Sequence, residues 1–339
     1  MYTFAPNVCH EEILKNRRPL LAFDENADYS AWKAQVTARF NDLLGDMPES
    51  RVPLKTVVEW EKEHDTFTER RIVFDTEENC SVPCHLWLPK GVKAPMPAVI
   101  CLQGHSTGMH ISMGRLIYPN DEQFTHGDED FAVQIVKRGY AALVLEQRDF
   151  GERKCDESIM KASTTCMHDA MVASLLGRTL IGERVWDVSR AVDLLETISE
   201  IDSTHIALMG LSGGGTATYY AGAYEKRISV IMPSGAVCAF DGSIGIMRHC
   251  PCNYIPRMAK YFDMGEIACL TAPRPLIVVT GAKDDIFLVD GVKKVYSTIE
   301  KIYAKENAPD NCRLIIGDGP HRFFADLAWK PFDKYFTGK

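Results

Sequence analysis

The sequence predicts an α/β protein with a mostly parallel, doubly wound β-sheet and helices on both faces. Short apolar segments typical of buried strands alternate with amphipathic helical segments from residue 98 to the end of the chain. The helical pattern is clearest at 183–198, where one face is lined by Val185, Val188, Ala191, Val192, Leu195 and Ile198. We find no internal repeat and no linker that would divide the chain.

Residues 1–65 are predicted to form a helical extension that packs on the main domain. Residues 29–44 are amphipathic, and Gly45 follows them as a helix stop. The apolar positions at helical spacing are Trp32, Val36, Phe40, Leu43 and Leu44. A simple structural role is the favoured interpretation of this extension, and contacts within a homo-oligomer are the minority alternative.

Residues 66–339 are predicted to form one catalytic domain. Two strands come first, at 67–74 and 82–88, around a polar turn at 76–79. The further predicted strands are 98–102, 140–145, 205–210, 227–233, 275–280 and 312–316. The predicted helices are 130–138, 183–198, a helix after Ser212, 292–303 and 326–336. Irregular insertions at 105–127, 154–180 and 236–272 are expected to shape the substrate pockets.

Composition limits the classes of function. The chain has 339 residues, of which 46% are hydrophobic and 25% charged, and a formal net charge of −8. Nucleic acid is not an expected partner, because there is no basic block or basic-aromatic stripe. The first residues lack the apolar core of a secretory signal, and no apolar run is long enough to cross a membrane. The 11 cysteines are scattered and odd in number, which favours a reducing cytoplasm over a disulfide framework.

The segment from Ala207 to Ala217 has the pattern of a buried strand, a sharp glycine turn and a helix of small residues. Ser212 lies on the turn in the frame Gly210-x-Ser212-x-Gly214, which is the pattern of a nucleophile elbow. An ordinary strand-to-helix turn would show the same pattern. A P-loop does not fit because no lysine follows the glycines, and the G-x-G-x-x-G spacing of dinucleotide sites is missing.

A serine nucleophile needs a base, and His321 is the candidate among the ten histidines. It follows the last predicted strand in a tight, glycine-rich loop. The base needs a carboxylate to orient it, and the strand 275–280 leads to Asp284 and Asp285. Either aspartate fits, and a turn cap is the alternative for each. The chain order Ser, Asp, His is that of α/β-hydrolases.

An oxyanion hole needs two backbone N–H groups aimed at the developing negative charge. One is expected from Gly213, the residue after the nucleophile, and the other from His105, which follows Gln103-Gly104 at the end of a strand. Ligands of doubly wound sheets bind beyond the carboxyl ends of the strands, and all of these candidates fall there.

Several segments resemble the α/β-hydrolase superfamily, and most closely its acetylxylan-esterase-like and dienelactone-hydrolase-like branch. They are Gly210–Gly214, Gln103–His105, Arg148–Arg153, Gly281–Asp284, Pro320–Phe323, Gly177–Asp187 and Asn253–Pro256. The resemblance covers residues 66–337 and implies an α/β-hydrolase fold and a serine esterase that deacetylates carbohydrate or small acyl esters. It also implies that the acid is Asp284, although relatives often have proline where this chain has Asp285.

We therefore expect a serine carboxylic-ester hydrolase with the triad Ser212, His321 and Asp284, acting on a small-molecule or oligosaccharide ester. A small serine peptidase of the prolyl-oligopeptidase type would share the triad, although 65 residues are too few for the usual propeller. A non-catalytic binding protein with the hydrolase fold is the alternative from another class.

No cofactor and no metal site is expected from the sequence. Cys250 and Cys252 form a C-x-C pair, but no second pair of ligands is evident. Arg148 and Glu152 follow a strand end near the expected site. Structural salt bridges are the favoured role for both residues, with substrate contact as the alternative.

Overall fold

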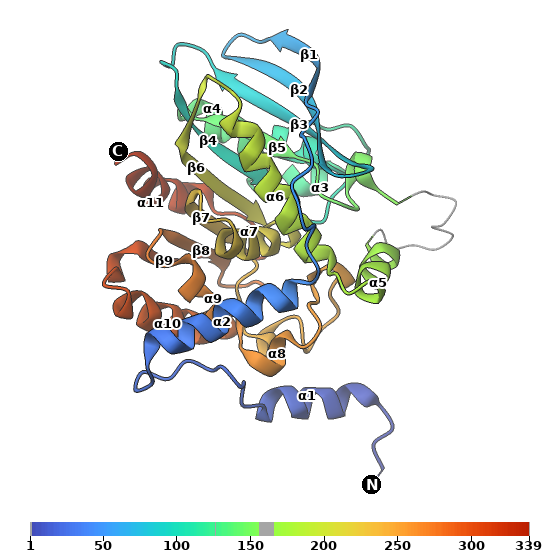
Figure 1. The fold of residues 1–339 in the computed structure, drawn as a ribbon, viewed down its shortest axis with the longest axis vertical. Coiled ribbons are helices and arrows are strands. Elements are labelled where there is room, and N and C mark those ends of the chain that lie inside the picture. Colours follow the sequence, from blue (N-terminus) through green and yellow to red (C-terminus); the bar gives the residue numbers. More distant parts are fainter. Residues whose placement is uncertain (1, 126, 156–165, 339) are drawn as a thin grey trace.

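The computed structural model of the chain describes residues 2–125, 127–155 and 166–338 (Figure 1). Within these residues a nine-stranded sheet runs in the order β1-β2-β3-β5-β4-β6-β7-β8-β9. The strands are β1 (Val57–Glu63), β2 (Phe67–Glu77), β3 (Cys80–Pro89), β4 (Met96–Leu102), β5 (Ala141–Leu145), β6 (Ile201–Leu211), β7 (Ile228–Ser234), β8 (Leu276–Gly281) and β9 (Cys312–Gly317). β1, β2, β3 and β5 pair antiparallel, and the pairs from β5 to β9 are parallel. The predicted mostly parallel sheet is confirmed.

The central strands are apolar on both faces because helices cover both sides of the sheet. In β4, Ala98, Ile100 and Leu102 belong to one core, and the alternate residues Val99 and Cys101 belong to the other. This alternation explains why the strand reads as a continuous apolar run.

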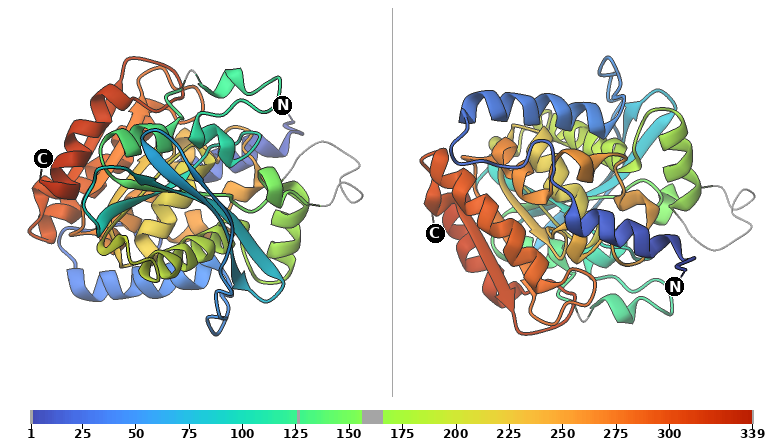
Figure 2. Two further views of the ribbon diagram at one scale, coloured as in Figure 1. Left: turned by 90° about the horizontal axis from the view of Figure 1, so that it is seen from above. Right: turned by 90° about the horizontal axis from the view of Figure 1, so that it is seen from below.

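Two helical layers enclose the sheet (Figure 2). One core contains side chains of α2 (Tyr29–Leu44), α6 (Leu180–Glu196), α7 (Gly213–Tyr224), α9 (Met264–Thr271) and α10 (Val289–Lys305). The core on the opposite face is closed by α4 (Phe131–Lys137) and α11 (Ala325–Thr337).

The N-terminal segment contains two helices and a strand. α1 (Pro6–Asn16) buries no residue and lies at the edge of the molecule, whereas all five predicted apolar positions of α2 are buried (Figure 1). The strand β1 lies inside the segment 1–65, where only helix was expected, so the sheet begins before the predicted boundary at residue 66. All of its residues are exposed, and it therefore lacks a buried apolar face.

The three predicted insertions hold short elements. The first contains a 3-10 helix, Met109–Met113, and α3 (Glu122–Thr125). The second contains α5 (Met167–Leu175), and its residues 156–165 lie outside the described residues. The third contains two 3-10 helices, Phe240–Gly242 and η4 (Pro251–Asn253), together with α8 (Met258–Tyr261) and α9.

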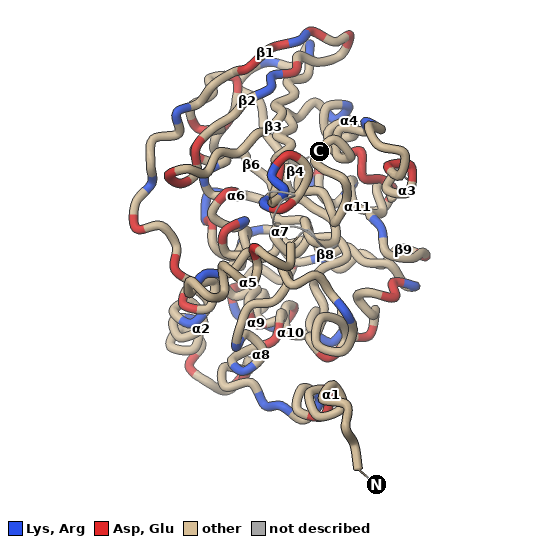
Figure 3. Tube along the Cα trace, turned by 90° about the vertical axis from the view of Figure 1, so that its right-hand side faces the viewer, with Lys and Arg blue, Asp and Glu red and all other residues tan. Residues whose placement is uncertain are grey.

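Acidic and basic residues alternate over the helices and loops, as Figure 3 shows. Among the described residues, no helix combines the length and the apolar character needed to cross a membrane.

Candidate active site

Ser212 lies between the end of β6 and the start of α7. Its backbone has φ 55° and ψ −119°, a conformation that residues other than glycine rarely adopt. The flanking glycines allow strand and helix to meet closely. A β-carbon at Gly214 would lie 2.2 Å from the carbonyl oxygen of Leu102, and one at Gly210 would lie 2.6 Å from the backbone of Gly214. The local geometry is that of a nucleophile elbow.

His321 and Asp284 are joined by a hydrogen bond of 2.7 Å between Nδ1 and Oδ2. The other carboxylate oxygen of Asp284 accepts bonds from the backbone N–H groups of Ile286 and Phe287, both at 2.9 Å. The Phe287 ring stacks on the imidazole with centroids 5.7 Å apart. Asp284 is buried, whereas Asp285 is exposed. Of the two predicted carboxylates, Asp284 is therefore the one that orients the ring.

The histidine and the serine both pack against the end of β7. The Ser212 N–H donates to the Ser234 carbonyl at 2.9 Å, and a β-carbon on the next residue, Gly235, would lie 2.6 Å from Cε1 of His321. His321 Nε2 is buried and has no hydrogen-bond partner within the part of the chain that the structure describes. A bond between a catalytic serine and its base is often long without substrate, so this nitrogen is available to take a proton.

His105 lies on the loop after β4 with its ring against the elbow. A β-carbon at Gly213 would lie 2.7 Å from Nδ1 and Cε1 of His105, so only glycine leaves room for the imidazole. Gly213 is the first residue of α7, where a backbone N–H has no acceptor within the helix. Both predicted oxyanion residues thus lie at the elbow.

Residues 4–313 match the model of a family described as the Abhydrolase family. The chain belongs to this family. This membership confirms the resemblance to the α/β-hydrolases on which the sequence prediction depends.

Three known proteins illustrate the relationship. The chain is 26% identical over 285 residues to "Putative hydrolase YtaP" of Bacillus subtilis (strain 168), with 82% of this chain and 90% of that protein covered. A "putative acetyl xylan esterase" from Bacteroides fragilis has a TM-score of 0.78 at 17% identity, covering 99% of this chain and 90% of that one. A glucuronoyl esterase from Solibacter usitatus has a TM-score of 0.68 at 18% identity, covering 94% and 96%. These structures confirm the α/β-hydrolase fold.

Glu129 lies at the candidate active site but was not predicted from the sequence. A β-carbon at Gly104 would lie 3.3 Å from Cβ of Ser212 and 3.8 Å from Oε2 of Glu129, so both side chains border Gly104. It is buried, and burial raises its pKa to about 8. In the sequence, Glu129 stands between two aspartates before a helix, where acidic residues are usually caps.

Arg148 and Glu152 form structural ion pairs. Arg148 binds both oxygens of Asp187 at 2.9 Å and also pairs with Glu77 at 2.5 Å. Glu152 binds Arg71 at 2.6 Å. The favoured interpretation of both residues is confirmed.

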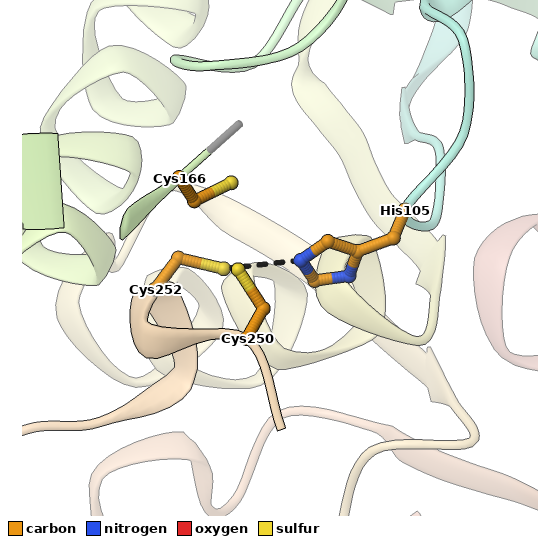
Figure 4. Close-up of side chains that lie close together, drawn as sticks. All are labelled: His105, Cys166, Cys250 and Cys252. Atoms are coloured by element: carbon orange, nitrogen blue, oxygen red, sulfur yellow. Dashed lines mark hydrogen bonds between the residues drawn. The ribbon is translucent and has the colours of Figure 1, made fainter. Parts of the chain in front are cut away.

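Among the residues that the structure describes, two groups of side chains have the composition of metal ligands. His105, Cys166, Cys250 and Cys252 bring their ligand atoms within 4.8 Å of one another beside the elbow (Figure 4). Cys155, His168 and Asp169 form the second group, of which His168 is exposed. The sequence shows the Cys250–Cys252 pair, but its partners come from two other loops, which spacing along the chain does not reveal.

Proposed function

We propose that this protein is a serine carboxylic-ester hydrolase that removes acetyl or other small acyl groups from carbohydrate or small-molecule esters. The observation that carries the proposal is the Asp284–His321 pair beside the elbow of Ser212, in which Nε2 is buried and has no hydrogen-bond partner in the described ranges of the chain. This arrangement supports proton removal from a serine that is partly exposed at a turn.

The mechanism follows from these positions. Ser212 Oγ attacks the ester carbonyl while His321 Nε2 takes its proton, and Asp284 stabilises the imidazolium that forms. The N–H groups of His105 and Gly213 bind the oxyanion, an interaction whose loss costs on the order of 3–4 kcal/mol. The tetrahedral intermediate expels the alcohol, which receives the proton from His321. Water then attacks the acyl-serine with His321 as base, and the carboxylic acid leaves.

The choice of an ester substrate rests on the relatives. Two structural neighbours are named as esterases, one a putative acetyl xylan esterase and the other a glucuronoyl esterase. A peptidase and a non-catalytic binding protein remain the alternatives.

The test is a panel of acetylated sugars, methyl glucuronate esters, nitrophenyl acyl esters and aminoacyl anilides, assayed with wild type and Ser212→Ala. We expect hydrolysis of the acetyl esters, and a fall in kcat of about 10⁴- to 10⁶-fold in the variant. Ser297→Ala is the control, because the Ser297 side chain is exposed on α10 and its hydroxyl donates to the Lys294 carbonyl of the same helix. A fluorophosphonate should label Ser212 in wild type.

Asp284→Asn and Asp285→Asn form a matched pair within the same experiment. Losing the carboxylate that holds Nδ1 should lower kcat by about 10⁴-fold in Asp284→Asn. Asp285→Asn should retain wild-type activity because this side chain is exposed. Cleavage of anilides in preference to esters would favour a peptidase, and the absence of both turnover and a Ser212 adduct would overturn the proposal.

A further inference from the structure

Three loops that are far apart in the sequence meet beside the elbow. His105 follows β4, Cys166 precedes α5, and Cys250 and Cys252 lie at the start of η4. Each of the three insertions, 105–127, 154–180 and 236–272, therefore contributes at least one side chain to the cluster. Figure 4 shows the imidazole directed toward the sulfur atoms.

The four side chains have the chemistry and spacing of a tetrahedral zinc site. Nε2 of His105 lies 3.2 Å from Sγ of Cys252, and all four ligand atoms lie within 4.8 Å of one another. Around a zinc ion with bonds of about 2.0–2.3 Å, such atoms stand about 3.5–3.8 Å apart, so small shifts of the side chains would complete the site. Cys166 and Cys252 are buried and the other two ligands are partly buried.

A buried arginine supplies an independent observation. Arg184 is 1% exposed, and its Nη2 donates to Sγ of Cys166 at 3.5 Å as well as to the Arg148 carbonyl at 2.7 Å. Its Nη1 is buried and has no hydrogen-bond partner among the residues that the structure describes. A buried guanidinium needs a nearby negative charge. The carboxyl group of Asp149 also interacts with this guanidinium. Three neutral thiols add no charge, whereas three thiolates around one Zn²⁺ carry one net negative charge.

We propose that His105, Cys166, Cys250 and Cys252 bind one zinc ion in a closed structural site. On binding, the three thiols lose their protons to solvent and neutral His105 donates the lone pair of Nε2. No oxidation state changes. All four positions are filled by protein, so the ion has no open position for substrate or water.

The site would fasten three loops to one another and to the elbow. The imidazole lies between the cysteines and Gly213, with Nε2 toward sulfur and Nδ1 toward the position of a Gly213 β-carbon. Zinc would thereby fix the position of residue 105, whose backbone N–H is the proposed oxyanion donor. Zinc binding itself does not depend on the esterase proposal, and its test needs no substrate.

The test is the metal content of the full chain, purified under reducing conditions without chelator and measured by mass spectrometry of the elements. We expect about one zinc per chain in wild type and less than about 0.1 in Cys250→Ser and Cys166→Ser, since a structural site needs all four ligands. Cys101→Ser is the matched control. Cys101 is buried in β4 outside the cluster, and its variant should retain the zinc.

Two measurements on wild type keep the test valid if a ligand variant does not fold. Zinc should protect the thiols of residues 166, 250 and 252 from alkylation, with the protection lost after chelation. Replacement by Co²⁺ should give the thiolate charge-transfer absorption of a tetrahedral site. A metal-free protein that neither binds zinc nor protects these thiols, or a disulfide among the three cysteines in the reduced preparation, would overturn the proposal.

Discussion

Ser212 has a strained backbone because its neighbours leave no other arrangement. The bond from its N–H to the Ser234 carbonyl ties the turn to β7, and Gly210 and Gly214 let β6 and α7 meet where any β-carbon would clash. Strain of this kind costs on the order of 1–3 kcal/mol, and the packed sheet on both sides supports it. The result is a hydroxyl group whose position is fixed before substrate arrives.

Glu129 leads to a prediction of pH dependence. Its folded-state pKa of about 8 lies above the ordinary glutamate value, so the carboxyl group stays neutral at moderate pH. The contribution of this group to the free energy of unfolding is greatest below the ordinary glutamate pKa. It is lost as the pH rises from that value to about 8. Above that pH, the negative charge of Glu129 would repel the oxyanion that forms next to Ser212. Glu129→Gln should therefore keep its esterase activity and its unfolding midpoint at higher pH than wild type, as measured by pH-rate profiles and thermal melts.

Glu122→Gln is the control for this experiment, since Glu122 is exposed on α3. Its pH profile should follow that of wild type. If wild type and Glu129→Gln lost their esterase activity and their thermal stability at the same alkaline pH, the role assigned to the buried carboxyl group would be contradicted.

Single residues differed in how far the sequence could predict them. The elbow was predictable because its constraint is local: three glycines and a serine within five residues. The residues alone did not separate Asp284 from Asp285, and only the family resemblance favoured Asp284, because the choice depends on which side chain is buried against a loop 37 residues further along the chain. Glu129 and Cys166 were missed for the same reason, since only folding brings them to Ser212 and His105.

At the scale of elements, α6 is held to the loop after β5 by a shared carboxylate. Asp187 accepts from Arg148 at 2.9 Å and from Arg153 at 2.7 Å. Burial favours its neutral form, but the two guanidinium groups outweigh that effect and hold the pKa of Asp187 well below its ordinary value. Its contribution to stability is therefore full at neutral pH and is lost only as the pH falls below the ordinary aspartate range.

Removing this carboxylate should destabilise the protein strongly. Asp187→Ala leaves two largely buried guanidinium groups without their common partner. We expect the free energy of unfolding to fall by about 3–5 kcal/mol in urea titrations. Asp318→Ala is the control, because Asp318 pairs with Lys283 in full contact with solvent. It should leave the midpoint unchanged. Equal midpoints for the two variants would show that the network does not stabilise α6.

Elements with a buried face were predictable, and elements without one were not. α2 has the predicted bounds, and β8 differs from its prediction by one residue at each end, because apolar side chains at a regular period mark both. β1 and α1 bury no residue, so their sequences carry no such period. Backbone pairing with β2 holds β1 in the sheet instead.

At the scale of the whole molecule, the N-terminal segment and the catalytic sheet share one core. Phe40 of α2 is fully buried and packs on Tyr220 of α7 with ring centroids 6.1 Å apart. α7 is the helix that begins directly after Ser212. The extension therefore supports the elbow from behind, although Phe40 lies 172 residues before Ser212 in the sequence.

Phe40→Ala should test this support. Truncating a fully buried phenylalanine costs about 3–5 kcal/mol, a large part of the 5–15 kcal/mol that ordinarily separates folded from unfolded chains. We expect a matching loss in urea titrations and lower esterase activity well below the melting temperature, because the cavity loosens α7. Phe4→Ala makes the same chemical change at a side chain that is 90% exposed, and it should alter neither quantity. If Phe40→Ala were as stable as Phe4→Ala, the buried face of the extension would contribute nothing to the stability of the catalytic domain.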